Sequence, residues 1–214
     1  MSASSTKRPL VAAALCAFAF ASPPTQAQTA DNAVPVKPGT VRITTKAPEP
    51  EKWNAETNAN HTQRVFKCKP LACSDPQTVS FSFQKSPTLH PNPQALEKFA
   101  KEELPKRIRA ASASREILSD GAEKIETISS ETATLKGYPS VVNESKFLKG
   151  SAATYVQTAI IFAGPLMIRV QSSSRDEQLA KTAMNQFIDL MKIEEGPPPP
   201  PGGGSKRQQS PQGI

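Results

Sequence analysis

One ten-residue run restricts the fold more than any other feature of this sequence. Residues 153–162 read ATYVQTAIIF, and apolar side chains alternate onto both sides of an extended chain. One side carries Val156, Ile160 and Phe162, and the other carries Tyr155, Ala159 and Ile161. A strand that is apolar on both sides belongs in the middle of a sheet that is covered on both faces.

Turn signals divide the region around this run into further strands. Strand signals dominate from Arg115 to Ser173, and turn-forming residues interrupt them at Asp120-Gly121, Gly137, Lys149-Gly150 and Gly164-Pro165. We therefore predict an antiparallel meander, with Asp120-Gly121 as one of its hairpin turns. Two earlier segments, TQRVFKC at 62–68 and TVSFSFQ at 78–84, are predicted to form an antiparallel pair.

Two helices are predicted, one before the meander and one after it. Asn92-Pro93 opens the first, with Asn92 as the N-cap and Pro93 at the first helical position. Its apolar face consists of Leu96, Phe99, Ala100, Leu104 and Ile108. Pro105 predicts a kink or an end, followed by at most a short second piece.

The last helix begins with Ser174 and Glu177 in the spacing of a capping box. Its apolar stripe consists of Leu179, Ala183, Met184, Phe187, Ile188 and Met191. The two helices and the meander together predict a single α+β domain over 41–193, in which two main helices pack on an antiparallel sheet as an α/β/α-like sandwich.

The two ends of the 214-residue chain differ from this core. Residues 1–27 resemble a secretory signal peptide, with Lys7 and Arg8 before an apolar stretch too short to span a bilayer. We predict cleavage between Ala27 and Gln28, a disordered leader over 28–40, and a disordered Pro/Gly-rich tail over 194–214. The tail is either a spacer, a docking handle for a partner, or simply a solvated end.

Export makes a disulfide the expected state of the remaining cysteines. Cys16 leaves with the signal peptide, so Cys68 and Cys73 are the only cysteines of the mature chain. We interpret their bond as a clip on the tip of the hairpin between 62–68 and 78–84. A thiol-active role is the alternative, although the spacing CxxxxC is not that of CxxC redox enzymes.

Charge and motifs limit the possible functions. The mature chain has 24 basic and 19 acidic residues, a net charge of +5 with the two signs interspersed, so we expect no nucleic-acid partner. The sequence contains no GxSxG, P-loop, HExxH, EF-hand or GxGxxG motif. We therefore predict no catalytic residue, no cofactor and no metal ligand, and hence no enzyme.

The order of elements resembles the PsbP-like and DcrB-like group of small exported α+β proteins. The resemblance covers about 62–193, and three segments carry it: LKGYP at 135–139, the strand at 153–162, and GPLMIRVQSSS before the last helix. It implies an accessory or binding protein outside the cytoplasm and supplies no catalytic residues.

The function predicted from the sequence is that of an exported, non-enzymatic accessory protein. It would reside in the periplasm or be secreted, be of bacterial origin, have no transmembrane segment in the mature chain, and be compatible with a monomer. Its partner would be a protein or a component of the cell envelope. The alternative is a small-ligand carrier or enzyme with a pocket between the sheet and a helix.

Overall fold

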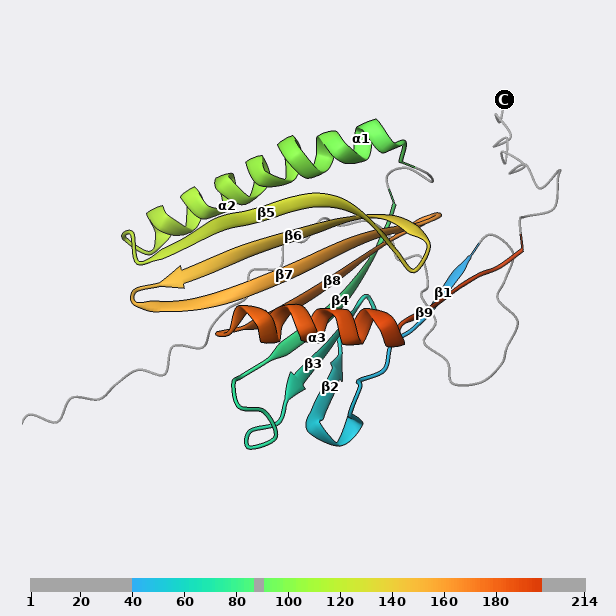
Figure 1. Ribbon diagram of the computed structural model, residues 1–214, viewed down its shortest axis with the longest axis horizontal. Coiled ribbons are helices and arrows are strands. Elements are labelled where there is room, and N and C mark those ends of the chain that lie inside the picture. Colours follow the sequence, from blue (N-terminus) through green and yellow to red (C-terminus); the bar gives the residue numbers. More distant parts are fainter. Residues whose placement is uncertain (1–39, 87–90, 198–214) are drawn as a thin grey trace, which may run out of the picture.

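The computed structural model describes residues 40–86 and 91–197. A seven-stranded antiparallel sheet carries helix α3 on one face and the connected helices α1 and α2 on the other (Figure 1). This arrangement is the predicted α+β fold class. The predicted signal peptide with its cleavage point at Ala27 and Gln28, the leader up to residue 39, and the tail from residue 198 onward lie outside the described residues.

The sheet has the strand order β2-β3-β4-β8-β7-β6-β5. Its strands are β2 (Trp53–Thr57), β3 (Gln63–Cys68), β4 (Thr78–Lys85), β5 (Glu123–Leu135), β6 (Tyr138–Lys149), β7 (Ala152–Ala163) and β8 (Leu166–Ser174). The predicted pairing of β3 with β4 is confirmed, as is the meander from β5 to β8. Strand β7 lies between β6 and β8, so the interior position predicted from its two apolar sides is confirmed.

Asp120-Gly121 is not a hairpin turn, and the prediction of strand structure from Arg115 is wrong. Helix α2 (Leu104–Leu118) continues through Arg115, and the turn connects this helix to β5. The hydroxyl of Ser119 closes the helix by donating to the Arg115 carbonyl at 2.7 Å, and it accepts from the Glu123 amide at 2.9 Å. These bonds to the start of β5 override the weak strand propensity of the segment.

Helix α1 (Pro93–Lys98) begins as predicted, because the Asn92 side chain accepts from the Ala95 amide at 2.7 Å. A π-helical turn, η2 (Phe99–Glu103), joins it to α2. This turn widens the helix immediately before Pro105, which has no amide hydrogen to donate. The chain then continues as a helix of 15 residues, so the expectation of a short second piece is wrong.

Helix α3 (Glu177–Leu190) packs on β4, β7 and β8 and buries the predicted residues Ala183, Met184, Phe187 and Ile188. The predicted Leu179 is only half-buried, and Ala180 is buried although it was not predicted. Its N-cap is Asp176, whose side chain accepts from the Leu179 amide at 2.8 Å. The predicted capping box of Ser174 and Glu177 is therefore wrong. Ser174 is the last residue of β8, and its hydroxyl donates to the Asp75 carboxylate at 2.6 Å. This contact comes from a loop 99 residues away, so local spacing could not indicate it.

Strand β2 was not predicted, and neither were three further elements. A short 3-10 helix, η1 (Pro50–Lys52), precedes β2, and the strands β1 (Val41–Thr44) and β9 (Lys192–Glu195) form a small separate sheet. Strand β9 therefore extends two residues beyond the predicted domain end at Ile193. The Gly196 amide donates to the Thr40 carbonyl at 2.8 Å and continues this pairing.

The disulfide expected between Cys68 and Cys73 is present at the connection from β3 to β4, with Cα atoms 6.3 Å apart. Among residues 40–86 and 91–197, no helix combines the length and apolar character that a bilayer crossing requires.

Candidate functional site at the N-terminus of helix α3

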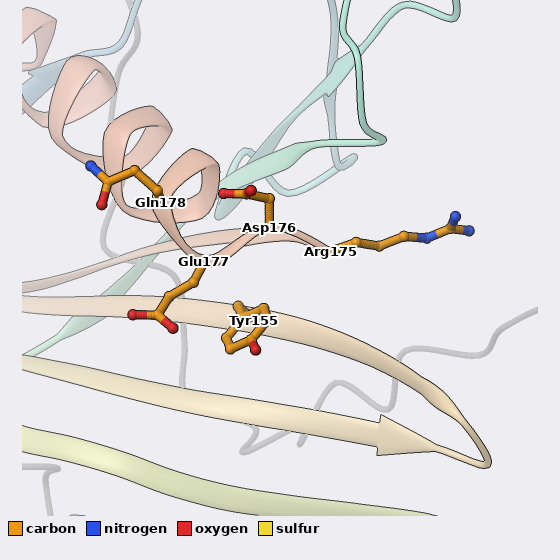
Figure 2. A pocket seen from close by; sticks show the side chains of 5 residues that line it. All are labelled: Tyr155, Arg175, Asp176, Glu177 and Gln178. Carbon is orange, nitrogen blue, oxygen red and sulfur yellow. The ribbon is translucent and has the colours of Figure 1, made fainter.

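An open pocket of about 440 Å³ lies where β8 passes into α3. It is lined by Tyr155, Arg175, Asp176, Glu177 and Gln178. Figure 2 shows the Glu177 side chain, from the first turn of α3, beside the ring of Tyr155 on β7, whereas Arg175 extends away from both. The wall nearest the sheet therefore consists of a carboxyl group and a phenol.

A row of three polar residues crosses the sheet next to this pocket. Glu144 on β6 is directly opposite Gln157 on β7, which is directly opposite Ser172 on β8. All three lie on the sheet face that carries α3, because Val79, the partner of Ser172 on β4, belongs to the core beneath that helix. Gln157 is 2% exposed and Ser172 is completely buried. The row marks the border between the apolar core and the open end of the sheet.

Each residue of this row buries a polar atom that has no hydrogen-bond partner. The atoms are Nε2 of Gln157, Oγ of Ser172 and Oε1 of Glu144. Buried polar atoms of folded proteins are nearly always hydrogen-bonded, because an unpaired one costs about 1–3 kcal/mol of folding free energy. Three unpaired atoms on adjacent strands therefore lower the stability of the folded protein.

The Glu144 carboxyl also contacts Glu177, and this contact raises the pKa of Glu177 above the ordinary value of 4.5. A hydrogen bond between the two carboxyl groups is the largest cause, and the charge of Glu144 follows it. Partial desolvation and the charge of Asp176 raise the pKa further, while Lys181 lowers it. Below the pKa of Glu177 the pair shares a proton, and above it two negative charges face each other.

This arrangement is suited to binding. An ionised pair of this kind accepts hydrogen bonds and attracts a positive charge. Among the residues that the structure describes, no three His, Cys, Asp or Glu side chains gather as a metal site.

Local sequence patterns do not indicate this site. The spacing of Ser174 and Glu177 predicts a helix cap, and no motif marks Glu144, Gln157 or Ser172 as site residues. The spacing of these residues carries no motif, because only the register of β6, β7 and β8 aligns them. Their one local signal is polarity at inward-facing strand positions, which is unusual next to an apolar core. The disulfide of Cys68 and Cys73 lies elsewhere, at the tip between β3 and β4.

Comparison with known proteins supports the fold. No protein-family model matches the chain. No curated sequence matches it either. Among solved structures, the cyanobacterial PsbP protein CyanoP from Synechocystis sp. PCC 6803 is 13% identical, with a TM-score of 0.51, over 77% of this chain and 98% of that one. The chain thus has the fold of PsbP, as the resemblance in its element order implied.

A second similar structure is LpqN of Mycobacterium tuberculosis, described as involved in cell envelope biogenesis. It is 18% identical with a TM-score of 0.46, over 75% of this chain and 89% of that one.

Proposed function

We propose that this protein is an exported, non-enzymatic accessory protein that binds its partner at the N-terminus of α3. Its N-terminal 27 residues have the organisation of a signal peptide, which supports residence in the periplasm or outside the cell. The PsbP fold supports an accessory role only by analogy, because one fold serves many functions. The site itself therefore carries the argument.

The decisive observation is the row of buried, unpaired polar atoms on Glu144, Gln157 and Ser172 beside the pocket. Such atoms lower the stability of the free protein. Because Gln157 and Ser172 are buried, a ligand can supply a missing partner only at Glu144, the half-buried end of the row. Strain and unsatisfied groups of this kind concentrate at functional sites.

The charge of the site favours a basic side chain of a protein partner. Glu144 and Glu177 repel each other once both are ionised, and an ammonium or guanidinium group between them would remove that repulsion. Because protonation of Glu177 competes with such a cation, binding should strengthen as the pH rises through the pKa of Glu177. The basic residues Arg175 and Lys181 beside the pocket restrict the direction from which the partner's charge can enter.

A photo-crosslinking amino acid at Gln178, which lines the pocket, tests the proposal in the host's own envelope fraction. We expect a defined adduct, and we expect Glu144→Gln combined with Glu177→Gln to reduce its yield at least tenfold. Glu116→Gln is the matched control, since it removes a carboxylate from the exposed surface of α2. An adduct that persists in the double variant, or that the control removes equally, would contradict the proposed site.

The alternative, a carrier or enzyme with its pocket between sheet and helix, is opposed by the packing beneath α3. Phe187 is completely buried there, and Met184 and Ile188 are at most 4% exposed. The Phe187 ring lies 4.9 Å from the rings of both Trp53 and Phe66. A small ligand would have to displace these side chains, whereas the pocket at the end of the helix is already open to solvent. The mass of the protein purified from its host, measured native and then denatured, distinguishes the two, because a carrier loses its ligand on denaturation.

A further inference from the structure

The loop between β3 and β4 holds a leucine in a position that the fold does not favour. The Ala72 amide donates to the Lys69 carbonyl at 3.1 Å, and φ of Leu71 is +73°, so Pro70 and Leu71 are the central residues of a type II turn. Such a turn takes glycine or asparagine at its second central position, because a larger side chain is strained there. Leu71 is nevertheless fully exposed, at 104% of its reference area, and gains no packing in return.

This turn is fixed in place by bonds at its base. The disulfide of Cys68 and Cys73 closes it, with Cα atoms 6.3 Å apart. The Lys69 amide donates to the Lys52 carbonyl at 2.8 Å and ties the turn to η1. Two residues beyond the disulfide, the Asp75 carboxylate accepts hydrogen bonds at 2.6 Å and 2.7 Å from the junction of β8 and α3. A side chain presented in one fixed conformation loses little entropy when it binds.

The loop is also basic. Residues 67–74 contain two lysines and no acidic residue. Lys67 is paired with Glu56 at 2.9 Å. The ammonium group of Lys69 donates to the Glu51 carbonyl at 2.6 Å, but no carboxylate lies within ion-pair distance of it in the part of the chain that the structure describes. A surface that receives this turn would therefore gain from acidic groups around it.

We propose that Leu71 is the apolar anchor of a protein–protein contact and enters an apolar pocket with an acidic rim on the partner. A single exposed leucine is common on protein surfaces, so exposure alone does not carry this inference. The strained backbone does, because strain that the fold does not repay is typical of binding sites. The proposal does not depend on the site at α3, since no residue of the turn lines that pocket.

A protein suits Leu71 better than a bilayer or a second copy of this chain. One leucine buries little apolar area, and even a myristoyl chain attaches a protein to a membrane only marginally. Ile117 and Leu118, which are also strongly exposed, end the helix that packs on β5, at the far side of the sheet from β3 (Figure 1). They therefore cannot join Leu71 on one membrane surface. The pocket at α3 is lined mainly by charged and amide side chains, so a second copy offers no apolar receptor there.

A photo-crosslinking amino acid at the exposed Ser74 tests the proposal with the whole mature protein in its host's envelope fraction. We expect an adduct with another protein, and Leu71→Ser should lower its yield at least tenfold, because burial of one leucine corresponds to about tenfold or more in affinity. Leu71→Met keeps an apolar side chain and should retain most of the yield. Leu118→Ser is the matched control, since it removes a leucine that is 87% exposed on α2, and it should leave the yield unchanged.

Salt tests the acidic rim. Added sodium chloride should lower the adduct yield of the native chain, and it should lower the yield of Lys69→Gln less, because that variant lacks the charge that the rim attracts. Equal salt dependence of the two chains would contradict the acidic rim.

Thermal unfolding separates a binding role of Leu71 from a structural one. Leu71→Gly suits the left-handed backbone, so it should unfold at the same temperature as the native chain or a higher one, while it lowers the adduct yield as much as Leu71→Ser does. A lower Tm would show that the fold itself needs this leucine. The absence of an adduct, an adduct with lipid or with a second copy of this chain, or equal yields from Leu71→Ser and Leu118→Ser would also overturn the proposal.

Discussion

The two faces of the sheet are covered by helices that are attached in different ways. Helix α3 buries five residues, four of them in an apolar core that includes Trp53, Phe66, Phe81 and Phe187. On the other face, α1 and the π-helical turn bury only Leu96 and Ala100, and α2 buries only Ser112. The longer helical layer therefore contributes the smaller core.

On the α2 face, side-chain hydrogen bonds to the sheet compensate for the smaller apolar core. The Ser112 hydroxyl accepts from the Ile125 amide at 2.8 Å, and the Ser130 hydroxyl donates to the Ala100 carbonyl at 2.7 Å. Arg115 pairs with Glu123 at 3.4 Å and also lies over the ring of Phe147. Directional hydrogen bonds therefore contribute much of the attachment of α2, whereas apolar packing attaches α3.

The largest effect is expected from Phe187→Ala in α3. Phe187 is fully buried and contacts the rings of Trp53, Phe66 and Phe81, so the variant should lose about 3–5 kcal/mol of unfolding free energy. Urea denaturation followed by circular dichroism measures the loss.

Leu96→Ala, in the smaller cluster on the other face, is the matched comparison. Leu96 is 6% exposed, and we expect a loss of about 2 kcal/mol, at the lower end of the range for such substitutions. Losses of equal size in the two variants would show that both faces contribute alike and would break the distinction between them.

Replacing Cys68 and Cys73 together by Ser should cost about 2 kcal/mol, because the closed loop is short. Cys68 packs at the margin of the α3 core, so the loss belongs to that side of the molecule. Thermal unfolding of the double variant, together with the crosslinking yield at Gln178, separates a structural clip from a thiol-active role. Loss of the adduct with an unchanged Tm would contradict the clip.

Ser112→Ala tests the hydrogen-bonded attachment of α2. The variant leaves the Ile125 amide without its partner, so we expect a loss of about 1 kcal/mol. Hydrogen exchange should accelerate at Ile125 and in α2, while α3 should remain as protected as in the native chain. Acceleration throughout the molecule would instead indicate that the two layers unfold as one unit.

The smallest expected changes in Tm come from replacing two carboxyl groups, Glu177 on the α3 face and Glu123 on the α2 face. The two changes should have opposite signs. The pKa of Glu177 is raised, so the folded protein loses stability as the pH rises through that pKa. The variant Glu177→Gln should therefore raise Tm at pH 7. Glu123 has a pKa lowered first by its hydrogen bond to Lys149 and also by Arg115. Its contribution is present at neutral pH and lost in acid, so Glu123→Gln should lower Tm at pH 7.

Both differences should disappear at a pH well below 4.5, where each carboxyl is protonated in the native chain. Differential scanning calorimetry across this pH range measures them. Shifts of the same sign for the two variants would contradict the assignment of Glu144 as the group that raises the pKa of Glu177.

How far the sequence predicts the structure depends on the range of the interactions. The turns at Lys149-Gly150 and Gly164-Pro165, the Asn92 cap and the stripe of α3 rest on neighbours a few residues apart, and these predictions are confirmed. The start of α3 was mispredicted because Ser174 bonds to Asp75, a residue remote in sequence. The end of α2 was mispredicted because Ser112 and Ser119 are bound by β5.

The α+β class, the meander and the interior position of β7 follow from local patterns, because hydrophobic periodicity and turn chemistry involve residues that are close in sequence. The position of the unusual polar residues does not follow from such patterns. Glu144, Gln157 and Ser172 come from three strands. Their proximity depends on sheet register and helix placement, which arise from packing of the whole chain and leave no periodic trace in any one segment.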